Sequence, residues 1–413
     1  MEKKKVLFVI NSLGLGGAEK SLVSLLPLFD YSKYDVDLLL FREGGMFRNL
    51  LDENVNVLPL PEFVQFCNMP LVKQLTSFNI KFLKSRINLF FALRKNAKSV
   101  NKIHDSQVYW NTCKNSFEVP KIDYDLAVGW GQGVPVKYVS TKVKAKKKAV
   151  WINADYEAVG HKRMDDLENF SNVDYIVSVS KKQTENMKQI FPEYSDKCYT
   201  IYDINNSKII EKMASEEVAL QNYDGLKIIT VGRYNDYKGY DMAIDACKIL
   251  VDKGYNVYWF AVGEGPERTK LENQIKEKKL ENRFVLLGAQ SNPYKYINSS
   301  DIYVQTSRFE GYCISLAEAR ILNKPCVTTN FDCVYNQIIQ EENGLIVEMT
   351  PEAIAIGVER LMNDNELRNS IIENLKQEKK GNLEEFNKFV KILLEEDYEK
   401  NTVYGNQYEC WRN

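Results

Sequence analysis

A chain of 413 residues is longer than one ordinary hydrophobic core and has the length of two domains with a cleft between them. Its 55 basic and 56 acidic residues give a net charge of −1, which provides no general electrostatic reason to bind nucleic acid. With eight cysteines, no Cys-x-x-Cys pair and two histidines, the composition indicates neither a zinc site nor a disulfide framework, and a reducing cytoplasm is the expected compartment.

The apolar run 6–10, which follows three lysines, is the first element that the sequence predicts. It is far too short for a signal peptide or for a membrane span of about 20 residues, so it is predicted to be a β-strand. No later segment reaches spanning length without charged residues. We therefore expect a cytoplasmic protein whose membrane contact, if it has one, is peripheral and on the inner face of the plasma membrane.

Short β-rich apolar runs alternate with helical patterns, which predicts parallel sheets covered by helices on both faces. In the first half we expect a helix at 19–29 and strands at 6–10, 36–41, 126–130, 149–152, 175–178 and 199–201. In the second half we expect strands, each followed by a helix, at 227–231, 257–262, 284–287, 302–305 and 326–328. The predicted fold class is α/β, with two doubly wound, Rossmann-like domains.

The polar stretch 205–225, which has few aromatic residues, is the predicted join between the domains. We expect a first domain at 1–205, a linker at 206–225 and a second domain at 226–382. The charged segment 383–413 is predicted to be a helical tail. It either caps the second domain or crosses back to the first, and the sequence leaves both courses open.

Glycines gather in the loop after the first predicted strand, at Gly14, Gly16 and Gly17, just before an amphipathic helix. Glycines at such a place let backbone N–H groups approach a ligand at the positive N-terminus of the helix. The loop comes close to a P-loop and to a dinucleotide-binding fingerprint, but Glu19 stands where both need glycine. ATP hydrolysis and NAD binding therefore lose support, and a plain tight turn remains the alternative.

Residues 63–104 contain no Asp or Glu but eight Lys or Arg, interleaved with aromatic and aliphatic residues. A basic amphipathic helix of this kind can lie in the interface of an anionic membrane, and we place that contact within 73–102. The lysine-rich run 142–148 adds charge that can join it. The alternative, of equal weight, is a helix that faces the core and leaves its cations in solvent.

The first predicted strand of the second half ends before Gly232, and the cations Arg233 and Lys238 follow in the loop that precedes the next helix. Arginine can bind a diphosphate with two hydrogen bonds, and lysine adds a point charge. Two exposed cations on a loop are usually only solvated. This loop, however, follows the carboxyl end of a strand, where open α/β sheets bind ligands, so the pair is a candidate clamp for a departing diphosphate.

Two glutamates follow the predicted strand 302–305: Glu310 in a loop, and Glu318 about two turns into the next helix. One carboxylate can hold sugar hydroxyls and the other ribose hydroxyls. Backbone N–H groups of Gly311 and Cys313 are available at the start of that helix. Two glutamates at this spacing are also common by chance, so the pair alone does not establish a site.

Together these motifs resemble the family four retaining glycosyltransferases, which have the GT-B fold. The resemblance extends over the whole chain, and the motifs occur in the family's order and spacing. They are Gly16-Gly-Ala-Glu-Lys20, Gly232-Arg with Lys238-Gly, the turn Gly263-Glu-Gly-Pro266, which by itself is mainly structural, and the pair Glu310 and Glu318. The resemblance implies transfer of a hexose or N-acetylhexosamine from a nucleotide sugar, usually a UDP-sugar. The implied acceptor is a glycan or lipid-linked glycan of bacterial surface polysaccharide synthesis, such as that of a capsule.

The resemblance also implies roles for individual residues. Arg233 and Lys238 match the donor diphosphate clamp, Glu310 matches the carboxylate that contacts the sugar, and Glu318 matches the ribose ligand. The other implied substrate-binding residues, whose backbone faces the donor, are Gly16, Gly17, Gly232, Gly311, Tyr312 and Cys313.

One candidate catalytic residue departs from the family pattern, because Asn153 stands where many relatives have a histidine near the reacting sugar. Asparagine donates and accepts hydrogen bonds but does not titrate, so no general acid or base is expected there. Either Asn153 only positions the sugar, or the activity is altered. His161 lies nearby in the sequence and can substitute, although we expect it to be a lone surface histidine.

The family's chemistry is described as same-face substitution, in which the departing phosphate helps to deprotonate the acceptor. Such a scheme needs stabilisation of the leaving group, and we expect neither a metal nor another cofactor. The Asp-x-Asp pairs at 35/37 and 123/125 precede predicted strands instead of ending them, which argues against a metal-bound donor. Two other functions remain open. One is a nucleotide-sugar epimerase of the same fold. The other is a non-catalytic partner subunit, which is suggested by Asn153 in place of the histidine.

Overall fold

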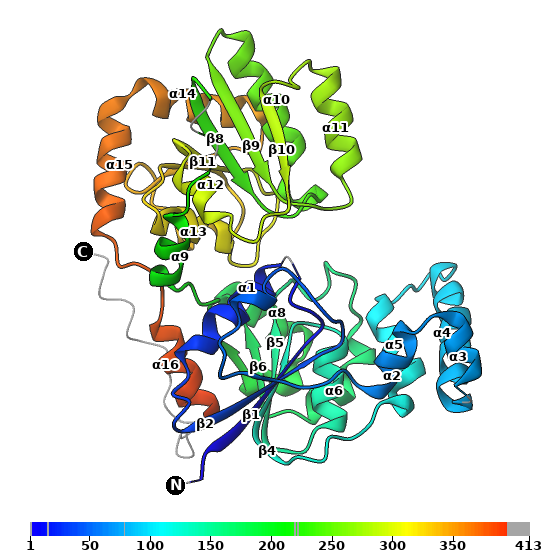
Figure 1. Cartoon of the computed structure of the whole chain (residues 1–413). Helices are drawn as coiled ribbons and strands as arrows, with labels where there is room; N and C mark the ends of the chain where they lie inside the picture. Colours follow the sequence, from blue (N-terminus) through cyan, green and yellow to red (C-terminus); the bar gives the residue numbers. More distant parts are fainter. Residues whose placement is uncertain (1, 15, 78, 219, 221–222, 395–413) are drawn as a thin grey trace.

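Two α/β lobes lie one above the other in the computed structural model, which describes residues 2–14, 16–77, 79–218, 220 and 223–394 (Figure 1). The first lobe contains a seven-stranded parallel sheet with the strand order β3-β2-β1-β4-β5-β6-β7. Its strands are β1 (Lys4–Ile10), β2 (Tyr34–Leu40), β3 (Asn56–Val57), β4 (Tyr124–Trp130), β5 (Ala145–Ile152), β6 (Tyr175–Ser178) and β7 (Cys198–Thr200). The central strands β1 and β4 are buried almost throughout, as their continuous apolar sequences predict.

The second lobe contains a six-stranded parallel sheet with the strand order β10-β9-β8-β11-β12-β13. Its strands are β8 (Leu226–Val231), β9 (Val257–Val262), β10 (Phe284–Gly288), β11 (Ile302–Gln305), β12 (Cys326–Thr329) and β13 (Leu345–Val347). Its helices are α10 (Tyr240–Asp252), α11 (Arg268–Glu277), α12 (Tyr294–Asn298), α13 (Ile314–Ile321), α14 (Pro351–Asn363) and α15 (Asn365–Gln377). In both sheets the strand order reverses beside the first strand, at β1/β4 and at β8/β11, which is where open α/β sheets bind ligands.

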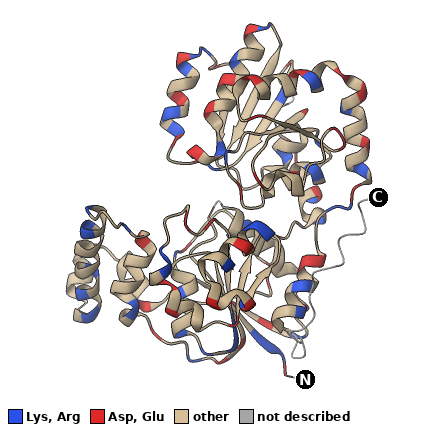
Figure 2. Ribbon diagram, turned by 180° about the vertical axis from the view of Figure 1, so that it is seen from behind, with Lys and Arg blue, Asp and Glu red and all other residues tan. Residues whose placement is uncertain are grey.

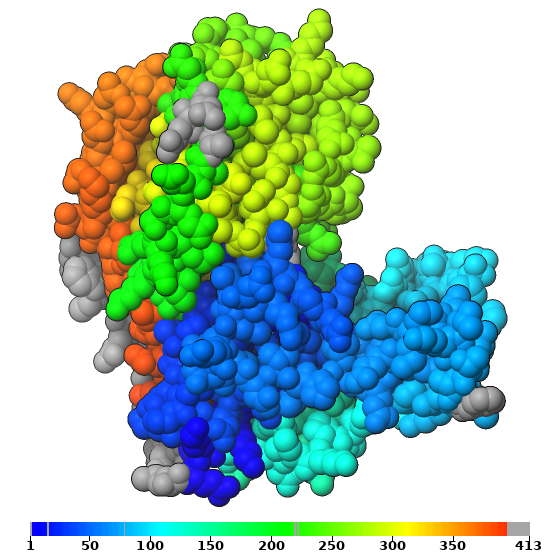
Figure 3. Space-filling model, in the orientation of Figure 1, coloured from blue at the N-terminus to red at the C-terminus, as the bar shows by residue number. Residues whose placement is uncertain are grey.

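The helices of the first lobe fall into two groups. Those that alternate with the strands are α1 (Gly17–Leu25), α6 (Val134–Lys142), α7 (Leu167–Ser171) and α8 (Lys181–Ile190). Four others come between β3 and β4 in the chain and form a unit at the side of the lobe: α2 (Glu62–Asn68), α3 (Leu71–Thr76), α4 (Ile80–Ala97) and α5 (Asp105–Cys113). In the space-filling view this helical side unit projects from the body of the molecule (Figure 3).

Every strand predicted from the sequence is present, with ends that differ by a few residues, and the predicted α/β class with two doubly wound sheets is confirmed. The short edge strands β3 and β13 were not predicted, because two or three residues carry no readable periodicity. The predicted helix 19–29 ends early, at Leu25, and a 3₁₀ turn follows. Pro27 explains this end, since it has no N–H to continue the α-helical hydrogen bonds.

The chain passes between the lobes twice. The first passage leads from β7 into α9 (Ser207–Ala214), and the second leads from α15 to α16 (Glu384–Phe389) and a π-helical turn at Val390–Leu394. This last segment lies against the first lobe, where Phe389 is fully buried and stacks on Phe8 with 6.0 Å between ring centres (Figure 1). The described part of the predicted tail 383–413 therefore crosses back to the first lobe, and residues 395–413 lie outside the described residues.

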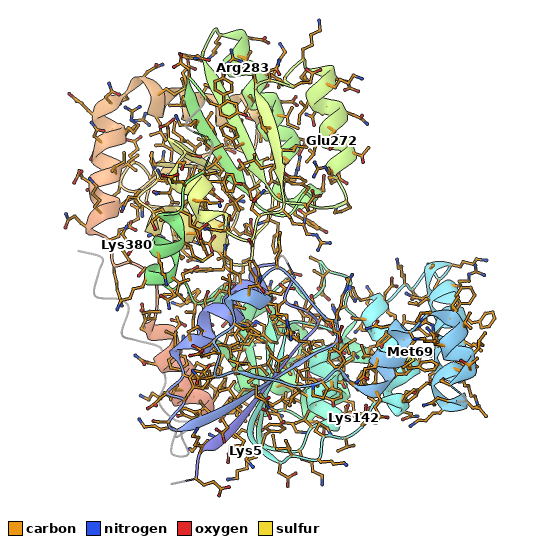
Figure 4. All side chains as sticks on the ribbon, viewed as in Figure 1. Lys5, Met69, Lys142, Glu272, Arg283 and Lys380 are labelled. Carbon is orange, nitrogen blue, oxygen red and sulfur yellow. The ribbon has the colours of Figure 1, made fainter. Side chains whose placement is uncertain are left out.

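The two passages are hydrogen-bonded to each other. The backbone N–H of Asn205 donates to Oδ1 of Asn382 at 2.7 Å, and Nδ2 of Asn382 donates to the carbonyl of Asp203 at 2.8 Å. The N–H of Tyr202 donates to Oε2 of Glu385 at 2.9 Å. Lys380, just before the second passage, is labelled in Figure 4. The lobes are thus connected by two segments of the chain that are hydrogen-bonded to each other.

None of the helices in the described part of the chain combines the length and the apolar character needed to cross a bilayer.

Candidate functional site

A cleft of about 440 Å³ lies between the lobes, at the carboxyl ends of both sheets. Loops after β1 and β5 line it from the first lobe, and loops after β8, β9 and β11 line it from the second. All the site residues expected from the sequence line this one cleft: Gly16, Gly17, Asn153, Gly232, Arg233, Lys238, Glu310, Gly311, Tyr312, Cys313 and Glu318. Gly263 and Glu264, whose turn was predicted to be mainly structural, line it as well.

Lys238 and Glu310 form an ion pair in the second-lobe wall of the cleft, with 2.5 Å between Nζ and Oε1. Ser307 donates to the same oxygen at 2.6 Å, and Gln305 donates to it at 3.2 Å. Burial disfavours the charged form of Lys238, but the Glu310 carboxylate outweighs this effect and raises the pKa of Lys238. Lys238 therefore carries a full positive charge at neutral pH in a fixed position.

Arg233 is exposed in the cleft, and its guanidinium makes no hydrogen bond or ion pair with the described residues. Gly232 precedes it, and a Cβ there would lie 3.2 Å from the Lys238 side chain. A Cβ on Gly263 would lie only 1.9 Å from the carbonyl oxygen of Gly232. These glycines let two loops and a lysine meet at the sheet edge, and they leave the guanidinium available to a ligand.

The loop before α13 has an unusual backbone. Cys313, which caps the N-terminus of α13, has φ of 66°, in the left-handed region that non-glycine residues rarely adopt. Such strain is common at ligand sites, and here Ile314 and Ser315, at the N-terminus of α13, border the cleft. Gly311 lies against the first lobe, since a Cβ there would be 3.1 Å from the Asn153 carbonyl oxygen.

Glu318 is 1% exposed, and one of its two oxygens is partnered. Oε1 accepts a hydrogen bond from the Tyr294 hydroxyl at 3.1 Å and lies 2.5 Å from Nζ of Lys20, which comes from the first lobe. Oε2 is buried without a hydrogen-bond partner among the described residues. Glu318 lies just over one turn into α13, closer to the helix start than predicted, because the helix begins only at Ile314.

The glycine loop of the first lobe brings a third carboxylate to the cleft. Gly16 caps the N-terminus of α1, and the carboxylate of Glu19 folds back beside it. Burial raises the pKa of Glu19, while a hydrogen bond from its own backbone N–H and the charge of Arg233 oppose that rise. Gly17 contacts the second lobe, since a Cβ there would be 3.3 Å from Cδ1 of Ile314.

Asn153 lies directly after β5 and faces the second lobe across the cleft. The side chain of Gln132 fixes its backbone, because Oε1 accepts from the N–H groups of Asn153 and Ala154 at 3.2 and 3.3 Å. Both Oδ1 and Nδ2 of Asn153 are buried and have no hydrogen-bond partner among the described residues. A buried amide without partners in a cleft wall is costly unless a ligand completes its hydrogen bonds.

The expectation that His161 is a lone surface histidine is wrong. Its side chain is 3% exposed and stacks on His104 with 4.5 Å between ring centres. Nδ1 of His161 lies 3.5 Å from the buried carboxylate of Asp166, which also pairs with the buried Lys137. His161 does not line the cleft among the described residues, so it does not take the role beside Asn153 that the sequence left open for it.

Sequence reasoning missed Asp203, which lines the cleft where the chain first leaves the first lobe. Burial raises its pKa to about 7, although a hydrogen bond from Ser21 opposes the rise. Oδ1 has no partner among the described residues. The only sequence signal was an acidic residue in the apolar context 201–204.

The described residues contain no group of three or more His, Cys, Asp or Glu that could hold a metal ion. Asp35 and Asp37 lie within β2 and Asp125 lies within β4, so these residues do not precede their strands as predicted. They lie in the amino-terminal parts of the strands, away from the carboxyl edge that forms the cleft.

Comparison with known proteins shows what the chain is similar to. Residues 213–378 match the model of the glycosyl transferases group 1. Over 371 residues the chain is 26% identical to the N-acetylgalactosamine-N,N'-diacetylbacillosaminyl-diphospho-undecaprenol 4-alpha-N-acetylgalactosaminyltransferase of Campylobacter jejuni, covering 88% of this chain and 92% of that protein. It is 31% identical over 204 residues to the capsular polysaccharide biosynthesis glycosyltransferase CapM of Staphylococcus aureus, covering 48% and 50% of the two chains.

Solved structures share the two-lobed architecture at low sequence identity. Anabaena HepE in complex with UDP and glucose superimposes with a TM-score of 0.66 at 16% identity, covering 91% of this chain and 94% of that chain. A variant of Staphylococcus aureus TarM in complex with Fondaparinux, alpha-GlcNAc-glycerol and UDP superimposes with a TM-score of 0.63 at 14% identity, covering 94% and 99%. The chain therefore has the GT-B fold, and residues 213–378 of its second lobe match the group 1 glycosyl transferases.

Proposed function

We propose that this chain is a retaining hexosyl- or N-acetylhexosaminyltransferase that uses a UDP-sugar and acts on a glycan or lipid-linked glycan acceptor in bacterial surface polysaccharide synthesis. The observation that carries the proposal is the convergence of Arg233, Lys238, Glu310 and Glu318 on one wall of the cleft, opposite Asn153. The complexes of HepE and TarM with UDP support the choice of base. The lipid-linked substrate in the name of the Campylobacter relative supports the choice of acceptor.

The charges of the cleft divide into two sets that match the two parts of a nucleotide sugar. Arg233, Lys238 and the first N–H groups of α13 provide positive charge for a diphosphate. Glu310 and Glu318 provide carboxylate oxygens for the hydroxyls of the sugar and of the ribose. Because Oε2 of Glu318 is buried without a partner, a ribose hydroxyl would satisfy an acceptor that the protein leaves open.

The proposed reaction is a same-face substitution at the anomeric carbon. The bond from this carbon to the phosphate oxygen breaks and its electron pair goes to the phosphate. A bond to the acceptor oxygen forms on the same face, and the acceptor proton passes to the departing phosphate. Arg233 and Lys238 neutralise the charge that develops on the diphosphate, and removal of one such preorganised group typically costs about 10²–10³ in turnover. Asn153 orients the sugar through its unpartnered amide and takes no proton.

A lipid-linked acceptor lies in a membrane, and we propose that the helical side unit contacts an anionic membrane surface. Ile87 and Phe91 on α4 are 49% and 63% exposed, and Leu71 and Val72 on α3 are 69% and 72% exposed. In Figure 2 the same unit carries Lys and Arg along α4 and no Asp or Glu there. Phe78, counted in the sequence pattern, lies outside the described residues.

The spacing along α4 places apolar and basic side chains on the same outer face. Ile80, Lys84, Ile87, Phe91 and Arg94 follow one another at intervals of three or four residues, and each of them is exposed. The inner face holds the buried Phe82, which packs on Phe63 at 5.3 Å between ring centres. If all the apolar side chains of α4 packed on the core, only its cations would be exposed to solvent. Exposed aromatic and aliphatic side chains between the cations favour the membrane interface instead.

The deciding experiment incubates purified protein with radiolabelled UDP- and GDP-sugars, with and without lipid-linked glycan extracted from bacterial membranes. Transfer of label to the lipid fraction, with retention at the anomeric carbon by NMR of the product, is the expected result. Conversion of the sugar without acceptor would identify a nucleotide-sugar epimerase. Binding of nucleotide without turnover would identify a non-catalytic partner, and inversion at the anomeric carbon would overturn the retaining mechanism.

A further inference from the structure

Lys20 is a first-lobe residue that reaches across the cleft into the wall of the second lobe. It lies on α1, and its Nζ is 2.5 Å from Oε1 of Glu318 on α13. The same Nζ is 4.4 Å from the ring centre of Tyr294, whose hydroxyl donates to the same carboxylate oxygen. The two charged side chains are 15% and 1% exposed, so this ion pair between lobes is almost dry.

Glu318 depends on Lys20 for its counter-charge. In the described part of the second lobe no cation pairs with Glu318, since the nearby Arg320 pairs with Glu378 at 2.6 Å. A carboxylate at 1% exposure without a positive partner is strongly disfavoured, because the loss of its hydration is not compensated. The buried charge of the second lobe is therefore balanced only when the first lobe is in contact with it.

We propose that Lys20 is a positioning residue that completes the nucleotide site by closing the first lobe on Glu318. Lys20 and Tyr294 hold Oε1 and so direct Oε2, which has no described partner, toward a ribose hydroxyl. The ribose is then bound by a carboxylate that is oriented from both lobes. The ribose part of this inference rests on the proposed function, whereas the closing contact does not.

A second ion pair between the lobes provides the matched comparison. Nζ of Lys182 on α8 contacts Oδ2 of Asp332 in the second lobe, but these side chains are 51% and 59% exposed. An ion pair in water contributes little, because both groups remain well solvated when it breaks. Lys182→Met therefore removes a lysine–carboxylate contact between the lobes without leaving a buried charge.

The experiment compares Lys20→Met, Lys20→Arg and Lys182→Met with wild type, after circular dichroism has shown that each is folded. By calorimetry, Lys20→Met is expected to bind UDP about 10-fold or more weakly, Lys20→Arg to recover most of the affinity, and Lys182→Met to match wild type. In the double variant Lys20→Met with Glu318→Gln, the loss is expected to be no larger than for Glu318→Gln alone, because both act through one carboxylate. Unchanged UDP affinity in Lys20→Met, or additive losses, would overturn the positioning role.

Small-angle X-ray scattering without nucleotide tests closure separately. The radius of gyration is expected to rise in Lys20→Met and to stay at the wild-type value in Lys20→Arg and Lys182→Met. Equal dimensions in all four proteins would overturn the closing contact. A wild-type protein that binds neither UDP nor GDP would instead overturn the proposed function, and the scattering result would still decide whether Lys20 closes the cleft.

Discussion

Arg233 and Lys238, the two cations of the cleft proposed to bind the diphosphate, differ in whether their side chains are paired. Lys238 is already paired with Glu310, whereas the guanidinium of Arg233 has no hydrogen-bond or ion-pair partner among the described residues. We expect Arg233→Ala and Lys238→Ala each to lower turnover on the order of 10²-fold or more, because a charge on the departing diphosphate would be lost. Steady-state rates with the donor found active test this. Lys248→Ala, at a surface pair with Asp252, is the control that should keep the wild-type rate.

Asn153 permits a test of which group takes the acceptor proton. If the phosphate takes it, Asn153→Ala should lower turnover without adding or removing a pKa near neutrality in the pH–rate profile. Asn153→His should be tolerated or mildly activating, because a neutral imidazole also donates and accepts hydrogen bonds. The profile is measured from about pH 5.5 to about pH 9. An inactive wild type that gains transfer activity in Asn153→His would show a catalytically silenced chain and contradict the enzyme proposal.

Asp203 should make the stability of the fold fall as the pH rises through neutrality. Burial raises its pKa from 3.8 to about 7, so between these values the folded state binds a proton that the unfolded chain releases. The contribution is complete below the unfolded pKa and is lost as the pH rises through 7. From about pH 5 to about pH 8 this amounts to on the order of 2–3 kcal/mol. Urea unfolding of wild type and Asp203→Asn measures it, and the asparagine variant should lose this slope.

At the scale of elements, the structure shows which side of the basic helix α4 is exposed. The sequence left open whether this basic, aromatic segment faces the core or a membrane, because periodicity alone does not say which face is covered. In the structure only one side of α4 packs, chiefly on α5, and the other side exposes apolar residues beside cations. Arg94 lies over the exposed ring of Phe90 at 4.2 Å, so the two kinds of side chain share one surface.

Charge reversal on α4 tests the membrane contact. Replacement of Lys81, Lys84, Arg94 and Lys95 by Glu should abolish flotation with vesicles rich in phosphatidylglycerol, since each basic residue near such a surface contributes about 1 kcal/mol. The same number of reversals on the second lobe, at Lys270, Lys276, Lys278 and Lys376, should leave flotation unchanged. Binding that persists after reversal on α4 would exclude this surface. Equal binding of wild type to phosphatidylcholine vesicles would exclude the electrostatic part of the argument.

At the scale of the molecule, the last described segment ties the end of the second domain to the core of the first. Phe389 packs against Phe8, Phe29 and Trp151, with ring centres at 6.0, 6.0 and 6.1 Å. We expect Phe389→Ala to lower the free energy of unfolding of the first lobe by about 3–5 kcal/mol, because a fully buried ring is lost. Chemical unfolding followed by tryptophan fluorescence measures this. Phe90→Ala, at a ring that is 51% exposed, is the control, and a similar loss there would contradict the assignment.

The two passages between the lobes explain why the cleft is a property of the whole molecule. Its walls come from loops after strands of separate sheets, and the lobes are joined by two passages of the chain that meet at Asn205 and Asn382. Lys20 and Glu318 are 298 positions apart in the sequence, yet they form one buried ion pair. Domain closure and nucleotide binding are thus expected to be coupled through the Lys20–Glu318 ion pair, which the Lys20 variants test.

The sequence by itself predicted most of the strands in their order along the chain, and many of the residues that line the cleft. It did so because apolar periodicity and glycine placement are local, and because parallel strands must bring their carboxyl ends to one edge. Glu310 and Lys238 could be assigned to one site for that reason, before any contact was known. The length of α1 and the position of Glu318 in α13 were less well predicted, since a proline and a left-handed Cys313 set those helix ends.

Only the tertiary structure decided which side chains lose water and meet across the cleft. It placed Lys20 on Glu318, stacked His161 on His104 away from the cleft, and buried Asp203 where the chain first passes between the lobes. It also showed that the tail packs on the first lobe, whereas the sequence allowed it to lie on either lobe. The physical reason is the same in each case. Burial and pairing depend on how segments far apart in the chain pack, and the free energy of a charge is set by its surroundings more than by its neighbours in sequence.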